Sequence, residues 1–409
     1  MRVCTIFRGA PATGKSTFIR ENGLEDYTVS LDNLRSLVSG TEPDVDGVET
    51  FCIDGKTNCQ LRTIFDTVLT ARFSNGLTTF IDGTFPTIKS VRGIVDLANK
   101  YGYMVRVANF QDGVSLDDAL RRNRNRKGVD IVPDKAVERI YRSVESGNKG
   151  FSRKFKTVSV SDILDFSSDV IPVINSDGRT VVIGDIQSCS NALSKALDIV
   201  LPGDNVIFTG DLFDRGTNPL GVYQQVTELL DDDSLGEVVL IEGNHDNHLR
   251  ELVLGLVSPD AWVKSGTRES LDKILSGGVK KGALRRFVHR FVGACFLKSG
   301  GREFVLTHGG VTKIPDLLTS FNYLFNGANE RDRQYSSLGS YSVETIKKLN
   351  LSGDVVQIHG HRNGTREEPT HSVKYSDKHY VLENRVEFGG TLPVAIIENG
   401  DVEIREFRD

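Results

Sequence analysis

The chain has 409 residues and a formal net charge of −5, with 38% hydrophobic and 26% charged residues, which are ordinary values for a water-soluble globular protein. A single core rarely grows beyond about 250–300 residues, so this length suggests two domains. No apolar run approaches the roughly 18 residues that a membrane span needs, and no signal-peptide pattern precedes the first predicted strand. We therefore expect a cytoplasmic protein with no membrane partner, in which any nucleic-acid contact depends on local basic patches.

Cysteine and histidine usage narrows the possible chemistry further. The five cysteines are scattered and none belongs to a CxxC pair, which predicts neither a disulfide framework nor a cysteine-ligated zinc site and fits a reducing compartment. All eight histidines lie at or beyond His245. Any metal site that uses imidazole is therefore expected in the second half of the chain.

The N-terminus carries a phosphate-binding pattern. A predicted strand over residues 2–8 runs into GAPATGKST at residues 9–17, a GxxxxGKS match that a helical pattern follows. Backbone N–H groups of such a loop wrap phosphates, the lysine reaches the β- and γ-phosphates, and the serine holds Mg²⁺. The predicted nucleotide-binding residues are Gly9, Thr13, Gly14, Lys15, Ser16 and Thr17.

The next segments contain residues that could bind the molecule to which the phosphate is transferred. A short predicted strand over residues 27–31 leads to Asp32, which could take the proton from an incoming hydroxyl, and Arg35 lies about one helical turn further on, where it could bind a phosphate. Spacing alone allows equally that Asp32 only caps a helix beginning at Asn33. Another predicted strand, over residues 77–81, ends at Asp82.

A basic run follows at residues 121–128, before a predicted helix over residues 134–144. Such runs are usually solvated helix faces. In a phosphate-handling domain, the alternative is a lid that places arginines on the triphosphate.

These motifs together resemble the kinase domain of the polynucleotide 5′-kinase family of phage and bacterial end-repair enzymes, over residues 1–150. The S-x-D-x-x-R motif of that family is matched by Ser30, Asp32 and Arg35. The resemblance implies that Asp32 is the general base, that Arg35 binds the acceptor phosphate, and that the cofactor is ATP or another nucleoside triphosphate with Mg²⁺.

The resemblance extends to the basic run. The R-N-x-x-R lid motif of the family is matched by Arg122-Asn123 and Arg126, which implies that Arg122 and Arg126 contact the triphosphate. The D-x-T-N segment of the family occurs here as DGTF at residues 82–85, and the missing asparagine leaves the role of this loop open.

Residues 151–177 have the composition of a connector, with frequent serines and short apolar runs, so we place a second domain at residues 178–409. In this half, polar clusters repeatedly follow β-prone segments, as expected for ligands at the carboxyl ends of strands. The clusters are GDIQS at 184–188, GDLFDRG at 210–216, GNHD at 243–246, THG at 307–309 and HGH at 359–361.

The order of these clusters resembles the binuclear metallophosphatase superfamily, in the branch of the bacterial polynucleotide kinase–phosphatases and the lambda and eukaryotic protein phosphatases. The resemblance implies two divalent metals, bridged by Asp211, that activate a water for attack on a phosphoester. It implies the metal ligands Asp185, Gln187, Asp211, Asn244, His308 and His361. It also implies that His245, paired with Asp214, protonates the leaving oxygen and that Arg215 binds the phosphate.

The departures from that pattern affect the first metal. Gln187 stands where the family has a histidine, which predicts a weaker first metal or one selective for Mn²⁺ or Mg²⁺. His359 could compensate as a ligand or could be a buried supporting histidine, and Glu383 could replace a late aspartate of the family. We interpret four other histidines as surface or core residues: His248, His289, His371 and His379.

We therefore expect an α/β protein, with a parallel-sheet P-loop domain followed by an α/β metallophosphoesterase sandwich. The resemblance implies a bifunctional end-healing enzyme of RNA or DNA repair, which phosphorylates 5′-OH ends and removes 3′-phosphate or 2′,3′-cyclic phosphate. The compact chain leaves no room for a ligase domain, so a separate ligase is an expected partner; analogy suggests a phage origin and thus the host cytoplasm. The alternatives are a second domain altered to a phosphodiesterase or a non-catalytic end-binding module, and an enzyme for nucleotides or phosphoproteins.

Overall fold

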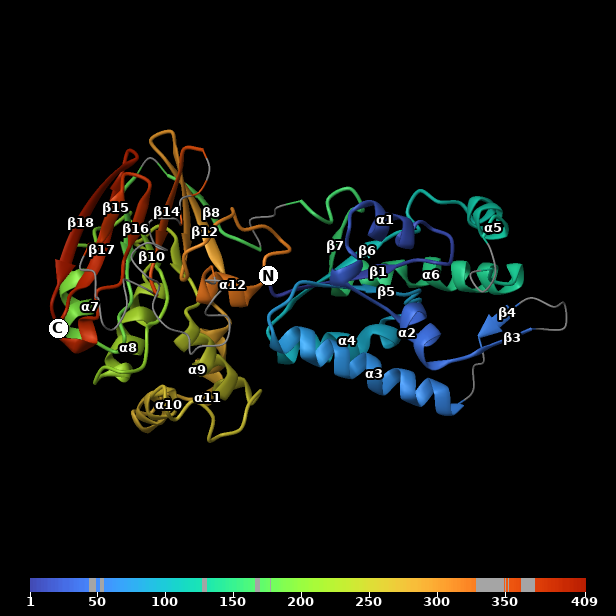
Figure 1. The fold of residues 1–409 in the computed structure, drawn as a ribbon, viewed down its shortest axis with the longest axis horizontal. Helices are drawn as coiled ribbons and strands as arrows, with labels where there is room; N and C mark the ends of the chain where they lie inside the picture. Colours follow the sequence, from blue (N-terminus) through green and yellow to red (C-terminus); the bar gives the residue numbers. More distant parts are fainter. Residues whose placement is uncertain are drawn as a thin grey trace. The chain divides into compact units, whose positions relative to one another are not determined.

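A computed structural model describes residues 1–43, 49–51, 55–126, 131–165, 170–176, 178–328, 349, 351, 353–361 and 372–409. The chain divides into two compact units, Met1–Asp165 and Phe166–Asp409. Both are mixed α/β, as the sequence predicts (Figure 1). Within the described residues, no helix combines the length and the apolar content needed to cross a membrane.

The first unit is built on a parallel sheet of five strands in the order β2-β5-β1-β6-β7. These strands are β1 (Val3–Arg8), β2 (Thr28–Ser30), β5 (Thr79–Asp82), β6 (Met104–Asn109) and β7 (Lys156–Val158). The helices are α1 (Lys15–Glu21), α2 (Leu31–Val38), α3 (Gly55–Ser74), α4 (Ile88–Lys100), α5 (Leu116–Arg124) and α6 (Asp134–Lys154). A separate antiparallel hairpin joins β3 (Thr41–Pro43) to β4 (Glu49–Phe51).

The predicted strands of this unit are found within a few residues of their expected positions. Helix α6 is ten residues longer than the predicted 134–144, because Val137, Val144 and Phe151 repeat every seven residues and bury one continuous stripe. Ser30, not Asp32, caps α2, since the Ser30 hydroxyl accepts a hydrogen bond from the Asn33 amide. The capping role considered for Asp32 is therefore wrong, and the Asp32 carboxylate is left for other contacts.

The expected connector, residues 151–177, is divided between the two units. Its first part completes α6 and adds β7 to the edge of the first sheet. Its last part supplies β8 (Val173–Asn175), which pairs with β12 in the second unit. Short, partly exposed edge strands of three residues have no clear hydrophobic alternation, so the sequence pattern could not distinguish them from a linker.

The second unit contains two stacked sheets. The first has the order β11-β10-β9-β17-β18, and its strands are β9 (Thr180–Ile183), β10 (Asn205–Phe208), β11 (Val238–Leu240), β17 (Leu392–Glu398) and β18 (Asp401–Phe407). The second has the order β15-β16-β14-β13-β12-β8, with β12 (Ala294–Ser299), β13 (Arg302–Thr307), β14 (Val355–His359), β15 (Lys374–Ser376) and β16 (His379–Val381). Its helices are α7 (Ser190–Leu197), α8 (Pro219–Leu230), α9 (Asn244–Leu254), α10 (Thr267–Ser276), α11 (Lys281–Val288) and α12 (Phe321–Asn326).

Strand β9 shows how the layers pack. Val182 joins the core between the two sheets, whereas Val181 and Ile183 join the core beneath the helices. Both faces of this strand are buried, which explains why it reads as a continuous apolar run rather than an alternating one.

Because neighbouring strands are parallel, the polar clusters that follow them lie at the same edge of each sheet. Strands β9, β10 and β11 are parallel and in register, with Phe208 opposite both Ile183 and Leu240, so the loops after them leave the same edge of the first sheet. Strands β13 and β14 are also parallel, with Thr307 opposite His359. The loops that carry the histidines therefore leave one edge of the second sheet together.

Candidate functional sites

The phosphate-binding loop of the first unit joins β1 to α1, as predicted. Gly14 has a left-handed φ of 106°, which a glycine adopts without strain. The Lys15 ammonium donates hydrogen bonds to the carbonyls of Gly9 (2.8 Å) and Ala10 (3.0 Å), which hold it against the loop. The Thr13 hydroxyl donates to the same Ala10 carbonyl at 2.9 Å. Ser16 and Thr17 are exposed in the first turn of α1, where they are accessible to a bound ion or phosphate.

Asp82 belongs to this site, although the sequence assigned it no role. It ends β5 opposite Phe7 of β1, one strand away from the P-loop. The Ser30 hydroxyl donates to Asp82 Oδ2 at 3.3 Å, and Oδ1 is buried with no hydrogen-bond partner within the described chain. Burial raises the pKa of the Asp82 carboxyl. Burial also lowers the pKa of the Lys15 ammonium, and the negative charge of Asp82 offsets only part of that shift. In the sequence, Asp82 is recognisable as a carboxylate at the end of a predicted strand. Only the strand order shows that this strand, β5, lies next to β1 and so brings Asp82 to the phosphate-binding loop.

The acceptor residues lie on α2 beside this loop. The side chain of Asp32 is 77% exposed, and its Oδ1 accepts a hydrogen bond from Arg35 Nη1 at 2.6 Å. A carboxylate held by an arginine but open to solvent can accept a proton from a substrate hydroxyl. The structure thus brings Asp32 and Arg35 together, as the motif predicts.

The basic run is only partly placed near the loop. Asn123 is fully buried and clamps the segment before α6: its amide donates to the Val132 carbonyl at 2.5 Å and its Oδ1 accepts from the Val132 amide at 3.2 Å. The charge of Arg126 acts on Lys15 and on Asp82. Arg122 is exposed on α5. Lys127 and Gly128 lie outside the described residues.

In the second unit, the loops after β9, β10, β11, β13 and β14 converge. Glycines allow this close approach: a Cβ on Gly243 would lie 2.2 Å from Asp211 Oδ1, and one on Gly360 would lie 1.9 Å from Asp185 Oδ1. Several side chains of the site have left-handed backbone conformations, a costly arrangement that is concentrated at functional sites. They are Gln187, Ser188, Asp211, Asp214, Arg215 and His361.

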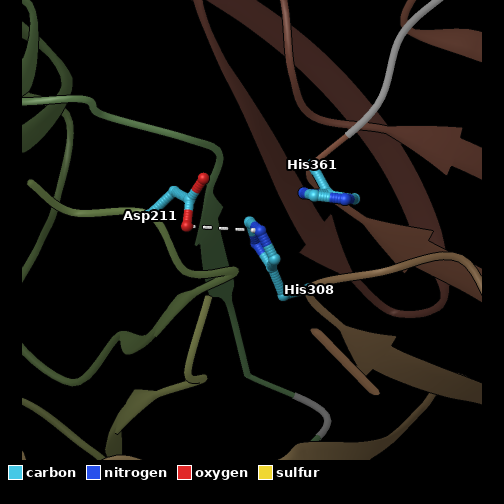
Figure 2. Close-up of side chains that lie close together, drawn as sticks. All are labelled: Asp211, His308 and His361. Atoms are coloured by element: carbon cyan, nitrogen blue, oxygen red, sulfur yellow. Dashed lines mark ion pairs between the residues drawn. The ribbon is translucent and has the colours of Figure 1, made fainter. Parts of the chain in front are cut away.

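Asp211 and the two histidines form the centre of this cluster (Figure 2). His308 Nε2 lies 3.4 Å from Asp211 Oδ1, and the rings of His308 and His361 are 4.9 Å apart. One ligand atom from each of Asp211, His308 and His361 lies within 4.8 Å of the others, although the histidines come from one sheet and the aspartate from the other.

The donor set fits a cation. His308 Nδ1 is 2.9 Å from the Thr209 carbonyl, which can only accept, so this nitrogen carries the proton. In the neutral ring, Nε2 then presents a lone pair, 3.2 Å from the Asn244 Oδ1 oxygen. Lone pairs of His308, Asn244 and Asp211 thus face one another, and a divalent metal satisfies all three.

Asp185 lies within the same cluster. Its Oδ2 accepts a hydrogen bond from the His361 amide at 2.9 Å, while His308 Nδ1 is 3.8 Å from its Oδ1. Burial, together with the charges of Asp211 and Glu383, raises the pKa of Asp185 well above its usual range. Crowding of buried carboxylates is what a bound cation relieves, so this side of the site also fits a metal.

Gln187 occupies the position predicted for a first-metal ligand. It is 2% exposed, and its Nε2 donates to Asp211 Oδ2 at 3.0 Å. Its Oε1 is buried and has no hydrogen-bond partner within the described chain. An amide oxygen in this state is a suitable ligand for a hard cation.

A dyad lies beside the metal ligands. His245 Nδ1 donates to Asp214 Oδ2 at 2.7 Å, and the His245 amide donates to Asp211 Oδ1 at 3.0 Å. Arg215 Nη2 donates to His245 Nε2 at 3.0 Å, and its Nη1 lies 3.2 Å from Glu387 Oε1. The Arg215 side chain is 41% exposed, whereas that of Glu387 is 1% exposed. The three predicted residues are brought together, and Glu387, on the short helix Val386–Phe388, is an anchor for Arg215 that the motifs did not reveal.

Two other acidic residues support the loops. Asp246 is fully buried and accepts hydrogen bonds from the amides of Leu212 (3.1 Å) and Gly243 (3.0 Å), so it ties together the loops that carry Asp211 and Asn244. Glu383 is buried near Asp185, and burial together with Glu387 raises the pKa of Glu383 to about 7. That Glu383 replaces a late aspartate of the family stays a prediction.

The remaining histidines of the second unit lie in different environments. His359 is fully buried, with Nδ1 2.7 Å from the Gly360 carbonyl and Nε2 3.0 Å from His379 Nε2, so both ring nitrogens have partners outside the metal cluster and the compensating-ligand hypothesis is wrong. His248, which the sequence predicts to be a surface or core residue, is partly buried, and its ring lies 5.5 Å from that of His245. Burial lowers the pKa of His248 to about 4, so the ring is neutral near pH 7. His289 is exposed, and His371 lies outside the described residues.

Comparisons with known proteins match both units. Residues 5–146 match the AAA domain family, and residues 178–394 match the calcineurin-like phosphoesterase family. The symmetrical bis(5′-nucleosyl)-tetraphosphatase of Ralstonia nicotianae is 32% identical over 150 residues, which are 37% of this chain and 47% of that protein. The Coxiella burnetii protein of the same name is 34% identical over 87 residues, 20% of this chain and 28% of that protein. The chain thus spans less than half the length of these curated relatives.

Solved structures also resemble the chain. A putative diadenosine tetraphosphatase has a TM-score of 0.42 and 16% identity, covering 58% of this chain and 98% of its own. A chain of the Pnkp1/Rnl/Hen1 RNA repair complex has a TM-score of 0.31 and 16% identity, covering 72% of this chain and 95% of its own. The calcineurin-like match covers more than half of the residues and contains every metal-binding candidate described above. A P-loop AAA-type unit therefore precedes the phosphoesterase unit, and the chain belongs to the calcineurin-like phosphoesterase family.

Proposed function

We propose that this chain is a bifunctional enzyme that heals nucleic-acid ends. The first unit would phosphorylate 5′-OH ends with a nucleoside triphosphate, and the second would remove 3′-phosphate or open 2′,3′-cyclic phosphate. The observation that carries this proposal is the combination, in one chain, of a P-loop beside a solvent-open carboxylate with a metallophosphoesterase site. The products, a 5′-phosphate and a 3′-OH, are the ends that a ligase joins, so we also propose a separate ligase as partner.

For phosphoryl transfer, the P-loop amides and Lys15 would bind the β- and γ-phosphates, and Ser16 with Asp82 would hold the nucleotide-bound Mg²⁺. Asp32 would take the proton from the 5′-hydroxyl as the oxygen attacks the γ-phosphorus. Arg35, which contacts Asp32 at 2.6 Å, would orient both this carboxylate and the acceptor phosphate. Arg126, whose charge acts on Lys15, would neutralise charge on the triphosphate.

For phosphate removal, divalent metals bound by the Asp211 cluster would supply an activated water and polarise the phosphate. The first metal would be held by Asp185 and Gln187. The second metal would be held by Asn244, His308 and His361. Asp211 would be a ligand of both metals. Arg215 would release His245 Nε2 and bind the phosphate oxygens. The freed Nε2 of His245 would take a proton from solvent, which the raised pKa of His245 beside Asp211 and Asp214 favours, and would pass it to the leaving oxygen while Asp214 holds the opposite nitrogen at 2.7 Å.

A second candidate is hydrolysis of dinucleoside polyphosphates by the second unit. The observation that favours it is the name shared by the curated relatives, which are symmetrical bis(5′-nucleosyl)-tetraphosphatases over the matched segments. Those segments cover only part of the relatives, and the same phosphate chemistry serves either substrate.

The test of the proposal is an assay with end-labelled oligonucleotides, as RNA and as DNA, carrying 5′-OH, 3′-phosphate, 2′-phosphate or 2′,3′-cyclic ends. Each substrate is incubated with ATP and with Mg²⁺ or Mn²⁺, and a bis(5′-adenosyl)-tetraphosphate reaction runs in parallel. We expect the 5′-OH oligonucleotides to gain a phosphate from ATP and the 3′-phosphorylated oligonucleotides to release theirs. Exclusive cleavage of the dinucleotide would favour the second candidate, and inert ends in every condition would overturn the end-healing proposal.

Replacing Lys15 with alanine should separate the two activities. Loss of a charge-stabilising donor of this kind costs about 10²–10³-fold in rate, so 5′-phosphoryl transfer should fall by that factor. Release of 3′-phosphate should stay unchanged, because Lys15 belongs to the first unit. Lys89→Ala, which removes an exposed lysine from α4, is the matched control. A simultaneous loss of phosphate release would contradict two independent sites.

Replacing Gln187 with histidine tests the altered first-metal position. Imidazole is a better ligand than an amide oxygen for Zn²⁺ and related softer ions, and metal affinity responds to changes around a site by about 10–100-fold. Isothermal titration with Zn²⁺ should therefore show the weaker of two binding events strengthened by at least about tenfold. Gln224→His, at an exposed position of α8, is the control. Unchanged stoichiometry and affinity would mean that Gln187 is not a ligand.

A further inference from the structure

The loop between α9 and α10, residues 255–266, carries the single tryptophan of the chain. Trp262 has a left-handed φ of 62°, which is unusual and costly for a bulky side chain. Its indole lies flat on His248, with ring centroids 3.7 Å apart and an interplanar angle of 12°. Its Nε1 donates to Glu251 Oε2 at 2.8 Å, and the residue remains partly exposed. The surrounding contacts therefore maintain a backbone conformation that the residue would not choose by itself.

The same loop is attached to the phosphate-handling residues at two points. His248, beneath the indole, is in edge contact with His245 at 5.5 Å. At the end of the loop, the Thr267 hydroxyl donates to Asp214 Oδ2, and Gly266 lies beside the backbone of Arg215, where a Cβ would be in ordinary van der Waals contact, 3.5 Å from the Arg215 nitrogen. Trp262 is thus separated from His245 of the dyad by one side chain, that of His248, and belongs to a loop whose end lies beside Arg215.

The two residues that follow Trp262 are exposed, one apolar and one basic. Val263 is 60% exposed, which is unusual for a large apolar side chain, and Lys264 beside it is also exposed. An aromatic ring with an adjoining aliphatic side chain is a sequence-tolerant platform for a nucleobase, because every base presents a π-face. The neighbouring lysine suits the next backbone phosphate.

We propose that Trp262, with Val263 and Lys264, forms a nucleobase-binding subsite of the phosphoesterase centre. The ligand class is the base of the nucleotide whose phosphate is removed, which packs against the exposed part of the indole while Arg215 binds the phosphate. This inference rests on the proposed function, since it assumes a nucleotide substrate. Trp262 acts here in recognition and touches no reacting atom.

The single tryptophan makes a direct measurement possible, because its fluorescence reports this loop alone. The probe is a short oligonucleotide that ends in a non-hydrolysable 3′-methylenephosphonate, and the control is the same oligonucleotide with an abasic terminal residue. With Mn²⁺ present, we expect the base-bearing probe to quench the fluorescence and to bind roughly tenfold more tightly than the abasic one, the scale expected for base–aromatic stacking. Equal affinity and unchanged fluorescence with both probes would overturn the proposal.

Variants separate recognition from folding. Trp262→Ala should lower kcat/KM for a 3′-phosphorylated oligonucleotide roughly tenfold, mainly through KM, and should leave hydrolysis of glycerol 2-phosphate unchanged because that substrate has no base. Trp262→Phe should restore most of the loss, and Leu201→Ala, which removes another exposed apolar side chain, should have no effect. An equal loss on both substrates would make the role of Trp262 structural and overturn the subsite.

The same experiment distinguishes this proposal from the function on which it rests. If no 3′-phosphorylated end is hydrolysed, the end-healing proposal fails, while quenching by a non-hydrolysable dinucleoside polyphosphate would still support the base subsite. If ends are hydrolysed but their bases leave affinity and fluorescence unchanged, the subsite fails and the end-healing proposal stands.

Discussion

Replacing Asp211 with alanine should lower release of 3′-phosphate from an oligonucleotide by about 10³–10⁴-fold, because metal-assisted charge stabilisation contributes several kcal/mol to such a reaction. Asp211 lies at the centre of the proposed metal cluster. Its Oδ1 accepts from the His245 amide and lies 3.4 Å from His308, and its Oδ2 accepts from Gln187. Burial raises the pKa of Asp211, but positive charge on His308 and His245, which a bound metal would replace, outweighs it and holds this pKa well below its usual range.

The Asp211 variant is measured by phosphate release and by bound Mn²⁺ after dialysis. Metal content should fall with activity, while 5′-phosphoryl transfer, which belongs to the other unit, should be unchanged. Asp231→Ala, in an exposed acidic turn, is the matched control. Activity within tenfold of the parent chain would show that Asp211 does not bridge metals.

Replacing Asp32 with alanine should lower 5′-phosphoryl transfer by about 10²–10⁴-fold, the contribution typical of a positioned general base. The structure excludes the simpler explanation for this residue, since Ser30 caps α2. With 77% of its side chain exposed and one oxygen paired with Arg35, Asp32 contributes little to the folded core, so its removal should change the rate and not the melting temperature.

Single-turnover transfer of labelled phosphate from ATP to a 5′-OH oligonucleotide measures the effect. Asp32→Asn, which keeps the size but not the basicity, should be as slow as Asp32→Ala. Asp96→Asn, at an exposed position on α4, serves as the control. If Asp32→Asn retains full activity, a basic oxygen is not needed and the general-base role is wrong.

Much of the fold could be predicted because its signals are local. Strand β9 was predicted at Thr180–Ile183 as found, and the P-loop follows a strand and precedes a helix as its glycine and lysine pattern requires. Where a signal was weak, the prediction differed from the structure. The sequence pattern predicts a linker where strands β7 and β8 lie, because edge strands of three residues carry almost no hydrophobic periodicity.

The residues that the sequence did not reveal are those to which no motif gave a role. Asp82 needed the knowledge that β5 lies beside β1, and Glu387 lies 172 residues from the arginine that it anchors. Trp262 and His248 meet through a loop and a helix whose contact no spacing rule predicts. His359 shows the reverse case: two residues before His361, it looks like a ligand by position, yet its ring pairs with His379.

The amino-acid sequence by itself determined which chemistry is available to each unit, because phosphate loops and metal ligands depend on short runs of glycine, acid and imidazole at the ends of strands. Only the tertiary structure decided which of these groups meet. Asp211 leaves the edge of one sheet and His308 and His361 leave the edge of the other, so their cluster exists only because the two sheets pack face to face. That packing is set by apolar residues of the strands, such as Val182, Phe304 and Val356, which lie outside the motifs, so no motif could show which of these groups meet.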